Sequence, residues 1–359
     1  MWTDTEITKR LGITYPIIQG PLGGGISSAK LVAAVSNAGG LGSYGANNLP
    51  PVQIKEVAAD IRQRTDKPFA INLWVDESTP PRPSKQMLAA TFAWFAPYYR
   101  ELGIYEPDLP DSFGQDYRAQ VEAVLVAKPR VFSFVFGIPS SEILRACRAQ
   151  SILTIGTATT VNEARALDEA GVNAIVASGF EAGGHRGSFL RPPEDCLMGT
   201  LALIPQVAEV VKVPVIAAGG IADARGIVAA LALGAQAAQI GTAFAACEES
   251  GAPAAHRDKL LGDGAKDTAL SRVFSGRLAR SVRNRFMEEM ASHAAELPPY
   301  PVQSWFTGTL RKAAIEQGRG DLISLQAGQA APLIRHRKAA ALMAELVRET
   351  PRVLARLSR

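Results

Sequence analysis

The chain has 359 residues, which excludes a single small module and fits one large α/β domain with an extension, or two domains. Apolar residues make up 47% and charged residues 20%, so a large core can form and no tract is polar enough to be disordered. The formal net charge of +4 comes from basic and acidic residues mixed along the chain, so it does not indicate nucleic-acid binding.

The first residues and the cysteines bear on the compartment. Met1–Glu6 carries two acids and lacks a basic segment followed by an apolar run, so a secretory signal is not expected. Cys147, Cys196 and Cys247 are far apart in sequence, without CxxC or zinc-ligand spacing. They therefore indicate neither a disulfide framework nor a metal site, and we expect a cytoplasmic protein.

Residues 226–247 contain no charged residue, and their length is close to the roughly 20 residues of a membrane span. Gln236, Gln239 and Thr242 interrupt the apolar pattern. The stretch divides more naturally into a helix over 226–233, a glycine stop and a short buried strand over 237–240. We therefore expect no membrane segment here.

Short apolar runs typical of parallel strands buried on both faces recur along the chain, and most are separated by amphipathic helical segments. Gly171 and Gly234 stand just past the ends of two of these helices. Eight such repeats predict a (β/α)8 TIM barrel; the alternative is an open doubly wound sheet, which seldom has eight strands so evenly spaced. The predicted strands are Pro16–Gln19, Leu41–Tyr44, Phe69–Leu73, Val131–Phe136, Ile152–Ile155, Ala174–Ala177, Val215–Ala218 and Ala237–Ile240, and the predicted helices include Ala29–Asn37, Val52–Arg64, Ser141–Ala149, Val161–Ala170, Leu201–Val211 and Ala224–Leu233.

Two segments do not fit the repeat. Residues 76–130 form an insertion after the third predicted strand, rich in aromatic residues and prolines. Insertions after a barrel strand lie on the face where active sites are built, so the segment is either a lid or a peripheral helical hairpin on the outer ring. The sequence that follows Phe244 is expected to form a mostly helical extension. We therefore expect a barrel core of residues 1–243, insertion included, and an extension of residues 244–359 that packs near the mouth of the barrel.

The strongest local signal is the glycine-rich segment Ser178–Gly187, which follows the sixth predicted strand and contains His185. Its glycines let the backbone approach a flat or phosphorylated ligand closely while the imidazole projects over it. A loop at the C-terminal end of a strand does not need an imidazole for packing, so we predict a functional role for His185. The other histidines, His256, His293 and His336, lie in the extension, where a solvated helix face without a catalytic role is expected.

Two further loops follow the seventh and eighth predicted strands. The first contains Gly219 and Gly220, and the second is Gln239-Ile240-Gly241-Thr242. Loops at these positions form a phosphate site that is frequent in TIM barrels, through exposed amides and a nearby helix N-terminus. Tight turn geometry is the alternative for either loop alone, but the two in this order predict a phosphorylated cofactor.

Features near the start of the chain suit the edge of a planar heterocycle. Gln19–Gly25 leaves bare backbone beside the barrel mouth, and Asn72 offers an amide at the end of the third strand, where a strand-end cap is the alternative. The sequence has no GxGxxG opening a βα unit, GxxxxGK[ST], HExxH or GxSxG, so dinucleotide folds, P-loop enzymes, zincins and serine hydrolases are not indicated. A tightly held flavin in a barrel fits best.

These segments resemble the successive signatures of nitronate monooxygenases, formerly called 2-nitropropane dioxygenases, over nearly the whole chain. Flavin-type enoyl-acyl-carrier-protein reductases and NADH:quinone reductases of the superfamily share the same loops. The resemblance therefore supports the fold and the FMN cofactor more strongly than it supports the substrate. Parts of the extension resemble the bacterial class I members. The segments are Gln19–Gly25, Ser133–Gly137 with Pro139, Gly179–Gly187, Ala217–Asp223 and Gln239–Thr242, and in the extension Ser275–Arg280 with Asn284, Pro299–Gln303 and Ala327–Gln329.

The resemblance implies FMN at the C-terminal mouth of the barrel, with His185 facing the substrate beside the flavin and no metal. Tyr300 would line the site with the substrate, and Gln329 would contact the cofactor. Ser178 stands where the family commonly has the longer Gln, and PLGGG replaces the more usual PMAGG. The phosphate would rest on Gly220, Gly241 and Thr242, in loops that also bring Gly219 and Gln239, and the ring would lie near Leu22, Gly23, Asn72, Ser178 and Gly183.

The activity implied by the resemblance is oxidation of an alkyl nitronate, such as propionate 3-nitronate, by O2 to a carbonyl compound plus nitrogen oxides. His185 would bind the nitro oxygens as a cation or donor, or, when neutral, remove the α-proton of a nitroalkane. Two alternatives stay open: an NAD(P)H-dependent flavin reductase acting on quinones or enoyl thioesters, and a non-catalytic flavin- or metabolite-binding protein. The expected partners are the nitronate and O2, without nucleic acid or membrane, and the chain is expected to be a monomer or homodimer.

Overall fold

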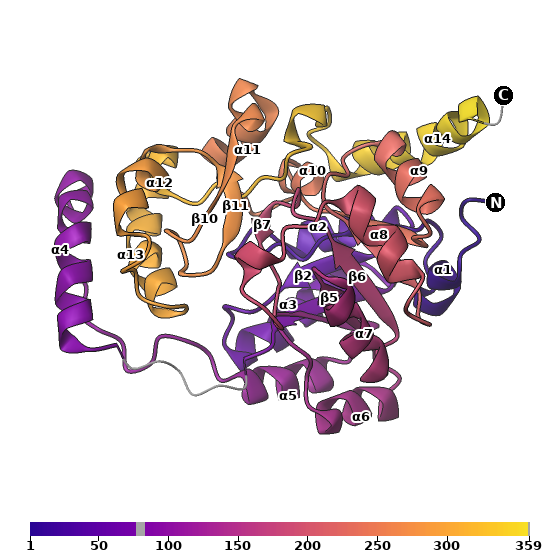
Figure 1. Ribbon diagram of the computed structural model, residues 1–359, viewed down its shortest axis with the longest axis horizontal. Helices are drawn as coiled ribbons and strands as arrows, with labels where there is room; N and C mark the ends of the chain where they lie inside the picture. The colour runs from indigo at the N-terminus through magenta and orange to yellow at the C-terminus, as the bar shows by residue number, and fades with distance from the viewer. Residues whose placement is uncertain (77–82, 358–359) are drawn as a thin grey trace.

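Eight parallel strands form a nearly closed barrel in the computed structural model, which describes residues 1–76 and 83–357 (Figure 1). The order around the sheet is β1-β9-β8-β6-β5-β4-β3-β2. The amide of Gln19 donates to the carbonyl of Leu41 at 2.9 Å, which joins the first strand to the segment before the second. The predicted barrel is therefore confirmed, with strands β1 (Ile17–Gln19), β2 (Gly42–Gly45), β3 (Phe69–Trp74), β4 (Val131–Val135), β5 (Leu153–Ala158), β6 (Ala174–Ser178), β8 (Val215–Ala218) and β9 (Ala237–Ile240).

The apolar side chains of the strands pack in two cores, one between the barrel and the helices and one inside the barrel. Successive side chains of a strand point to opposite faces, so in β6 Ile175 and Ala177 pack outward against the helices, while Ala174 and Val176 pack inside the barrel. The inner cluster also includes Ile7 of α1 (Glu6–Leu11), so this short helix packs against the barrel interior. Continuous apolar strands are therefore required, because both faces are buried.

Apart from α5, which lies in the insertion, the helices of the outer ring follow the predicted positions. Ser28 and Thr160 each cap a helix by accepting a backbone N–H, and Gly171 and Gly234 take left-handed conformations just past helix ends, as expected of helix stops. The uncharged stretch from residue 226 is a helix followed by a strand, and no helix in the described part of the chain is long and apolar enough to cross a membrane. These helices are α2 (Ala29–Asn37), α3 (Pro51–Arg64), α5 (Tyr117–Ala127), α6 (Ser141–Ala149), α7 (Val161–Glu169), α8 (Thr200–Ala208) and α9 (Ala224–Ala232).

The ring is completed by a helix from the far end of the sequence. After β9 comes only the four-residue helix α10 (Thr242–Ala245), and the long α14 (Ala339–Leu357) packs against α9 and α2. Its apolar side buries Leu342, Met343 and Leu346. The expected division of the chain at residue 243 stays a prediction, and these contacts join the two parts across it.

The insertion after β3 contributes to two different layers. Helix α5 packs against α3 in the outer ring, whereas α4 (Lys85–Leu102) packs against α13 (Val302–Glu316) of the extension. Phe95 of α4 is fully buried, with its ring 5.3 Å from that of Phe306 in α13. Figure 1 shows α4, α12 and α13 together on one side of the barrel. The first helix of the insertion therefore packs on the extension and not on the outer ring; residues 77–82 lie outside the described residues, and a lid role stays a prediction.

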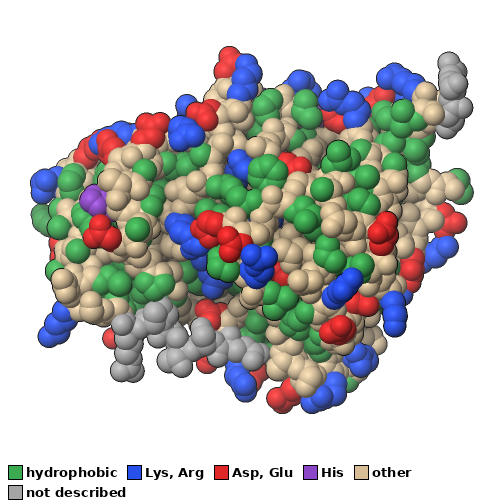
Figure 2. Space-filling model, viewed as in Figure 1, with side chains coloured by type: hydrophobic (Ala, Val, Ile, Leu, Met, Phe, Trp, Pro, Cys, Tyr) green, Lys and Arg blue, Asp and Glu red, His purple; other side chains and the backbone are tan. Residues whose placement is uncertain are grey.

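The rest of the extension contains a small antiparallel sheet of order β10-β11-β7. Acidic and basic side chains are mixed over the face seen in Figure 2, consistent with the mixed charges of the sequence. The remaining elements are β7 (Gly184–His185), β10 (Thr268–Ser271), β11 (Ala279–Val282), α11 (Ala254–Leu261), α12 (Arg285–Glu289) and the 3-10 helices η1 (Pro193–Asp195), η2 (Asp263–Lys266), η3 (Ala291–His293), η4 (Gly320–Leu322) and η5 (Ala331–Leu333).

Substitution in α14 tests its place in the ring. Leu346 is 1% exposed, so Leu346→Ala removes packing against the barrel helices and is expected to lower the free energy of unfolding by about 2–5 kcal/mol. Leu357→Ala in the same helix is the control, since that side chain is 73% exposed. Urea unfolding followed by circular dichroism measures both. Equal, small effects would show that α14 is not part of the packed ring.

Candidate functional site

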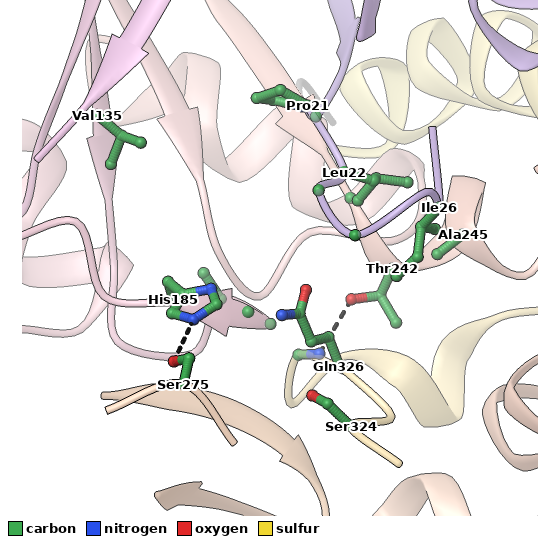
Figure 3. A pocket seen from close by; sticks show the side chains of 18 of the residues that line it. Pro21, Leu22, Ile26, Val135, His185, Thr242, Ala245, Ser275, Ser324 and Gln326 are labelled. Carbon is green, nitrogen blue, oxygen red and sulfur yellow. Dashed lines mark hydrogen bonds between the residues drawn. The ribbon is translucent and has the colours of Figure 1, made fainter. Parts of the chain in front are cut away.

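A cavity of about 430 Å³ lies at the C-terminal ends of the barrel strands, between the barrel mouth and the extension (Figure 3). Its barrel side is formed by the loops after β1, β6, β8 and β9, and its other side by α13 and residues 322–330. The structure brings most of the predicted site residues together here: Leu22, Gly23, Asn72, Ser178, Gly183, His185, Gly219, Gly220, Gln239, Gly241 and Thr242 all line the cavity.

Two predicted site residues lie outside this lining. The side chain of Gln329 is exposed, and its backbone amide donates to the carbonyl of Glu181 at 2.9 Å. Tyr300 lines a neighbouring cavity of about 320 Å³, which shares Asn47 and Trp74 with the first. The glutamine of this part of the extension that lines the main cavity is Gln326, three positions before Gln329.

His185 is held by a strand that pairs with the extension. The segment after β6 forms β7, and its two residues pair antiparallel with β11, with His185 opposite Ala279. The next amide, of Arg186, donates to the carbonyl of Leu278 at 2.8 Å. The loop of a barrel strand thus becomes the edge of a sheet built from the extension, which fixes the backbone beneath the imidazole.

The surroundings of His185 keep its imidazole neutral. The Nε2 atom lies 2.7 Å from the Ser275 hydroxyl, and the ring meets Trp74 edge-on at 4.7 Å between centroids. The guanidinium of Arg277 lies 4.0 Å from the centroid of Phe136, close to the imidazole. Burial, with the positive charge of Arg277 as a smaller cause, lowers the pKa of His185 to about 3. Near pH 7 the side chain is therefore a neutral imidazole with one unprotonated ring nitrogen, and it is not a cation.

A buried arginine holds the start of the same loop. The side chain of Arg186 is 1% exposed, and its guanidinium donates to the carbonyls of Gly179 at 2.7 Å and Ser178 at 3.1 Å. Burial lowers the pKa of Arg186 to about 10, which leaves it charged at neutral pH. Because hydrogen bonds from a charged donor are stronger than neutral ones, the loop is fixed before any ligand enters.

Close backbone contacts join the loops. A Cβ on Gly183 would lie 2.5 Å from the amide nitrogen of Gly328, so only glycine fits between the His185 loop and the extension. The Gly328 amide donates to the Thr242 hydroxyl at 3.0 Å. After β8, Gly219 and Gly220 both have positive φ angles, of 99° and 70°. These loops therefore depend on glycine for their conformation. The missing side chains also let a ligand in the cavity approach the backbone.

Asn47 presents a buried acceptor to the cavity. Its Nδ2 donates to the side chain of Asn48 at 2.8 Å, whereas its Oδ1 is buried and receives no hydrogen bond from the residues that the structure describes. Gln120 donates to the carbonyls of Asn47 and Leu49, at 3.0 and 2.8 Å, and so holds this loop in place. An unpaired buried acceptor costs about 1–3 kcal/mol, so Asn47 Oδ1 is suited to an N–H donor of a ligand.

The expectation of a solvated His256 is wrong. Its side chain is 1% exposed, and Nε2 lies 2.9 Å from the carbonyl of Gln326. The apolar residues of helix α11 are not gathered on one face, so no sequence pattern indicates that the face with His256 is covered. His293 stacks on Trp94 at 4.5 Å, and His336 Nε2 lies 2.6 Å from a Glu345 carboxylate oxygen.

Several lining residues were not predicted as site residues. Trp74 is the last residue of β3 and Phe136 follows β4, so both could have been noted as aromatic residues at strand ends. Ser275, Arg311 and Gln326 come from the extension, and no local pattern shows that they reach the barrel. All three cysteines are free and buried, and within residues 1–76 and 83–357 no cluster of three or more potential ligands could hold a metal ion.

Comparison with known proteins gives one consistent family. The nitronate monooxygenase family model matches residues 4–349. A probable nitronate monooxygenase of Staphylococcus aureus (strain Newman) is 39% identical over 360 residues, with 99% of each chain covered. A solved structure of a nitroalkane oxidase from Streptomyces ansochromogenes is 38% identical, with a TM-score of 0.88 over 98% of this chain and 99% of that one. FabK from Thermotoga maritima is 29% identical, with a TM-score of 0.77 over 99% and 98%.

The burial of His256 predicts a pH-dependent stability. Burial lowers the pKa of His256 to about 4, so between pH 4 and 6.5 the unfolded state binds more protons and the free energy of unfolding falls as the pH is lowered. Gln at this position keeps a donor for the Gln326 carbonyl but does not titrate. From pH 7 to 5 the wild type is expected to lose about 2 kcal/mol more than His256→Gln in urea unfolding. The same loss in both proteins would contradict a lowered pKa of His256 in the folded state.

Proposed function

This chain belongs to the nitronate monooxygenase family, and from that premise we propose that it oxidises alkyl nitronates such as propionate 3-nitronate to carbonyl compounds plus nitrogen oxides, using FMN and O2. The observation that carries the proposal is a single cavity in which a neutral His185 faces the glycine loops of the barrel mouth. The chemistry then needs one ligand that moves electrons and one side chain that handles a proton.

The residues of the cavity fit FMN. A volume of about 430 Å³ lies within the range of about 300–1,000 Å³ typical of cofactor sites. Gly220, Gly241 and Thr242 would hold the phosphate; the Thr242 hydroxyl accepts from Gly328, so its own proton is available for a phosphate oxygen. The free Oδ1 of Asn47 suits a ring N–H. When bound, FMN supplies an electron acceptor for the substrate and a route to O2.

Leu22, Gly23, Asn72, Ser178 and Gly183 would flank the ring. Asn72 donates from Nδ2 to the Ser133 hydroxyl at 3.0 Å, so its amide is oriented and its oxygen is available to a ligand. Ser178 uses its carbonyl to accept from Arg186, and its short side chain leaves space where the family commonly has Gln. We propose that this space is filled by the cofactor or by water.

His185 supplies the proton chemistry. As a neutral imidazole it takes the α-proton of a nitroalkane, whereas a preformed nitronate has already lost that proton and needs only to be oriented. The guanidinium of Arg277, which lies over Phe136 beside the imidazole, adds positive charge near this end of the cavity and so favours an anionic substrate. Trp74 and Phe136 line this end of the cavity and exclude water, which strengthens these interactions.

A flavin reductase that uses NAD(P)H and acts on quinones or enoyl thioesters is the second candidate, because FabK shares the fold at 29% identity. An anaerobic visible spectrum of the purified protein separates the two. Under the proposal, propionate 3-nitronate reduces the flavin and NAD(P)H does not. Reduction by NAD(P)H alone would establish the reductase, and a flavin that responds to neither would indicate a binding protein.

The role of His185 predicts different losses for two substrates. His185→Asn removes the base, so the kcat/KM for neutral nitroethane is expected to fall by about 10²–10⁴-fold, while that for ethyl nitronate falls much less. His336→Asn, a histidine that lies outside the cavity lining, is the control. Oxygen consumption with each substrate measures the effect. Unchanged turnover of nitroethane by His185→Asn would rule out this role.

A further inference from the structure

The hydroxyl of Ser275 contacts three polar atoms beside the imidazole (Figure 3). Its Oγ lies 2.7 Å from His185 Nε2, 3.2 Å from the carbonyl oxygen of Arg277 and 3.3 Å from the amide nitrogen of Arg277. Ser275 is 4% exposed and lies between β10 and β11, the strands that carry the His185 segment at their edge. Its geometry is thus set by the same sheet that positions the histidine.

The hydrogen-bonding capacity of a hydroxyl decides the direction of each contact. A serine hydroxyl has one proton to donate and two lone pairs to accept with. The Arg277 carbonyl only accepts, so it takes the Ser275 proton, and the Arg277 amide only donates, so it uses one lone pair. One lone pair is left for the imidazole, so the arrangement that satisfies all three groups has Nε2 as the donor.

The opposite arrangement leaves polar groups unpaired. If Ser275 donated to Nε2, the Arg277 carbonyl would face a lone pair, and the ring proton would move to Nδ1. Nδ1 has no hydrogen-bond partner among the residues that the structure describes. The Arg277 carbonyl then loses its hydrogen bond from Ser275, so this tautomer is disfavoured.

We infer that Ser275 is a positioning residue that holds His185 in the Nε2–H tautomer and thereby makes Nδ1 the atom that accepts the substrate proton. Figure 3 shows the second ring nitrogen on the side of the imidazole away from Ser275. The edge-on contact with Trp74, at an interplanar angle of 68°, resists rotation of the ring. The tautomer follows from the hydrogen bonds alone, and the part of Nδ1 in proton abstraction rests on the proposed function.

The tautomer is measured directly by NMR of the holoenzyme labelled with ¹⁵N-histidine, with His185→Asn used to assign the signals. Wild type and Ser275→Thr, which keeps the hydroxyl, are expected to show His185 protonated on Nε2 only. Ser275→Ala removes the acceptor, so a mixture with the Nδ1–H form is expected. Protonation of wild-type His185 on Nδ1, or an unchanged tautomer in Ser275→Ala, overturns the inference.

Kinetics test the consequence for the reaction. Ser275→Ala is expected to lower the kcat/KM for nitroethane by at least about tenfold and to raise its substrate deuterium isotope effect, because proton transfer becomes slower. Ethyl nitronate, which needs no proton removal, should change by less than about threefold, and Ser275→Thr should restore turnover of nitroethane. Equal losses on both substrates, or no rescue by Thr, contradict a positioning role.

Ser271→Ala is the matched control. That hydroxyl lies at the end of β10 and accepts from the Val273 amide at 3.2 Å, but it does not contact His185. It should leave both the tautomer and the two kcat/KM values unchanged. A wild type that turns over neither substrate would refute the proposed function, whereas the NMR measurement on the same protein would still decide the tautomer.

Discussion

The pairing of β7 with β11 is the constraint on which the site depends. It turns a loop of the barrel into an edge of a sheet that belongs to the extension, so His185 has a fixed backbone although it lies outside the barrel sheet. The same pairing brings Ser275 and Arg277 against the imidazole. The guanidinium of Arg186 then fixes the other end of the loop by donating hydrogen bonds to the carbonyls of Gly179 and Ser178. Preorganisation of this kind lets a side chain act without rearrangement during the reaction.

The barrel could be predicted because its signal is local. Strands buried on both faces must be apolar throughout, and their helices begin at capping residues and end at glycines such as Gly171. The eighth ring helix and the small sheet could not be predicted in the same way. A two-residue strand such as β7 has no periodicity, and the contact of α14 with α2 joins segments that are far apart in sequence.

The site residues also separate into those that local sequence predicts and those that it does not. Loops after strands were predicted to gather because the ends of parallel strands meet, and Gly220, Thr242 and Asn72 do share one cavity. Gln329 was placed in the site by resemblance, whereas the structure exposes its side chain and turns Gln326 inward. Segments of the extension without regular secondary structure give no information on which side chains face inward, so their contributions needed tertiary contacts to be identified.

The position of α14 has a consequence for synthesis on the ribosome. Residues 241–338 separate the last barrel strand from this helix, and at about 5–20 residues per second their translation takes roughly 5–20 s. Throughout that interval the apolar flank of α2 and α9 lacks its cover, although every strand of the barrel has already been made. The nascent polypeptide thus exposes an apolar surface, which is the kind of surface that chaperones bind.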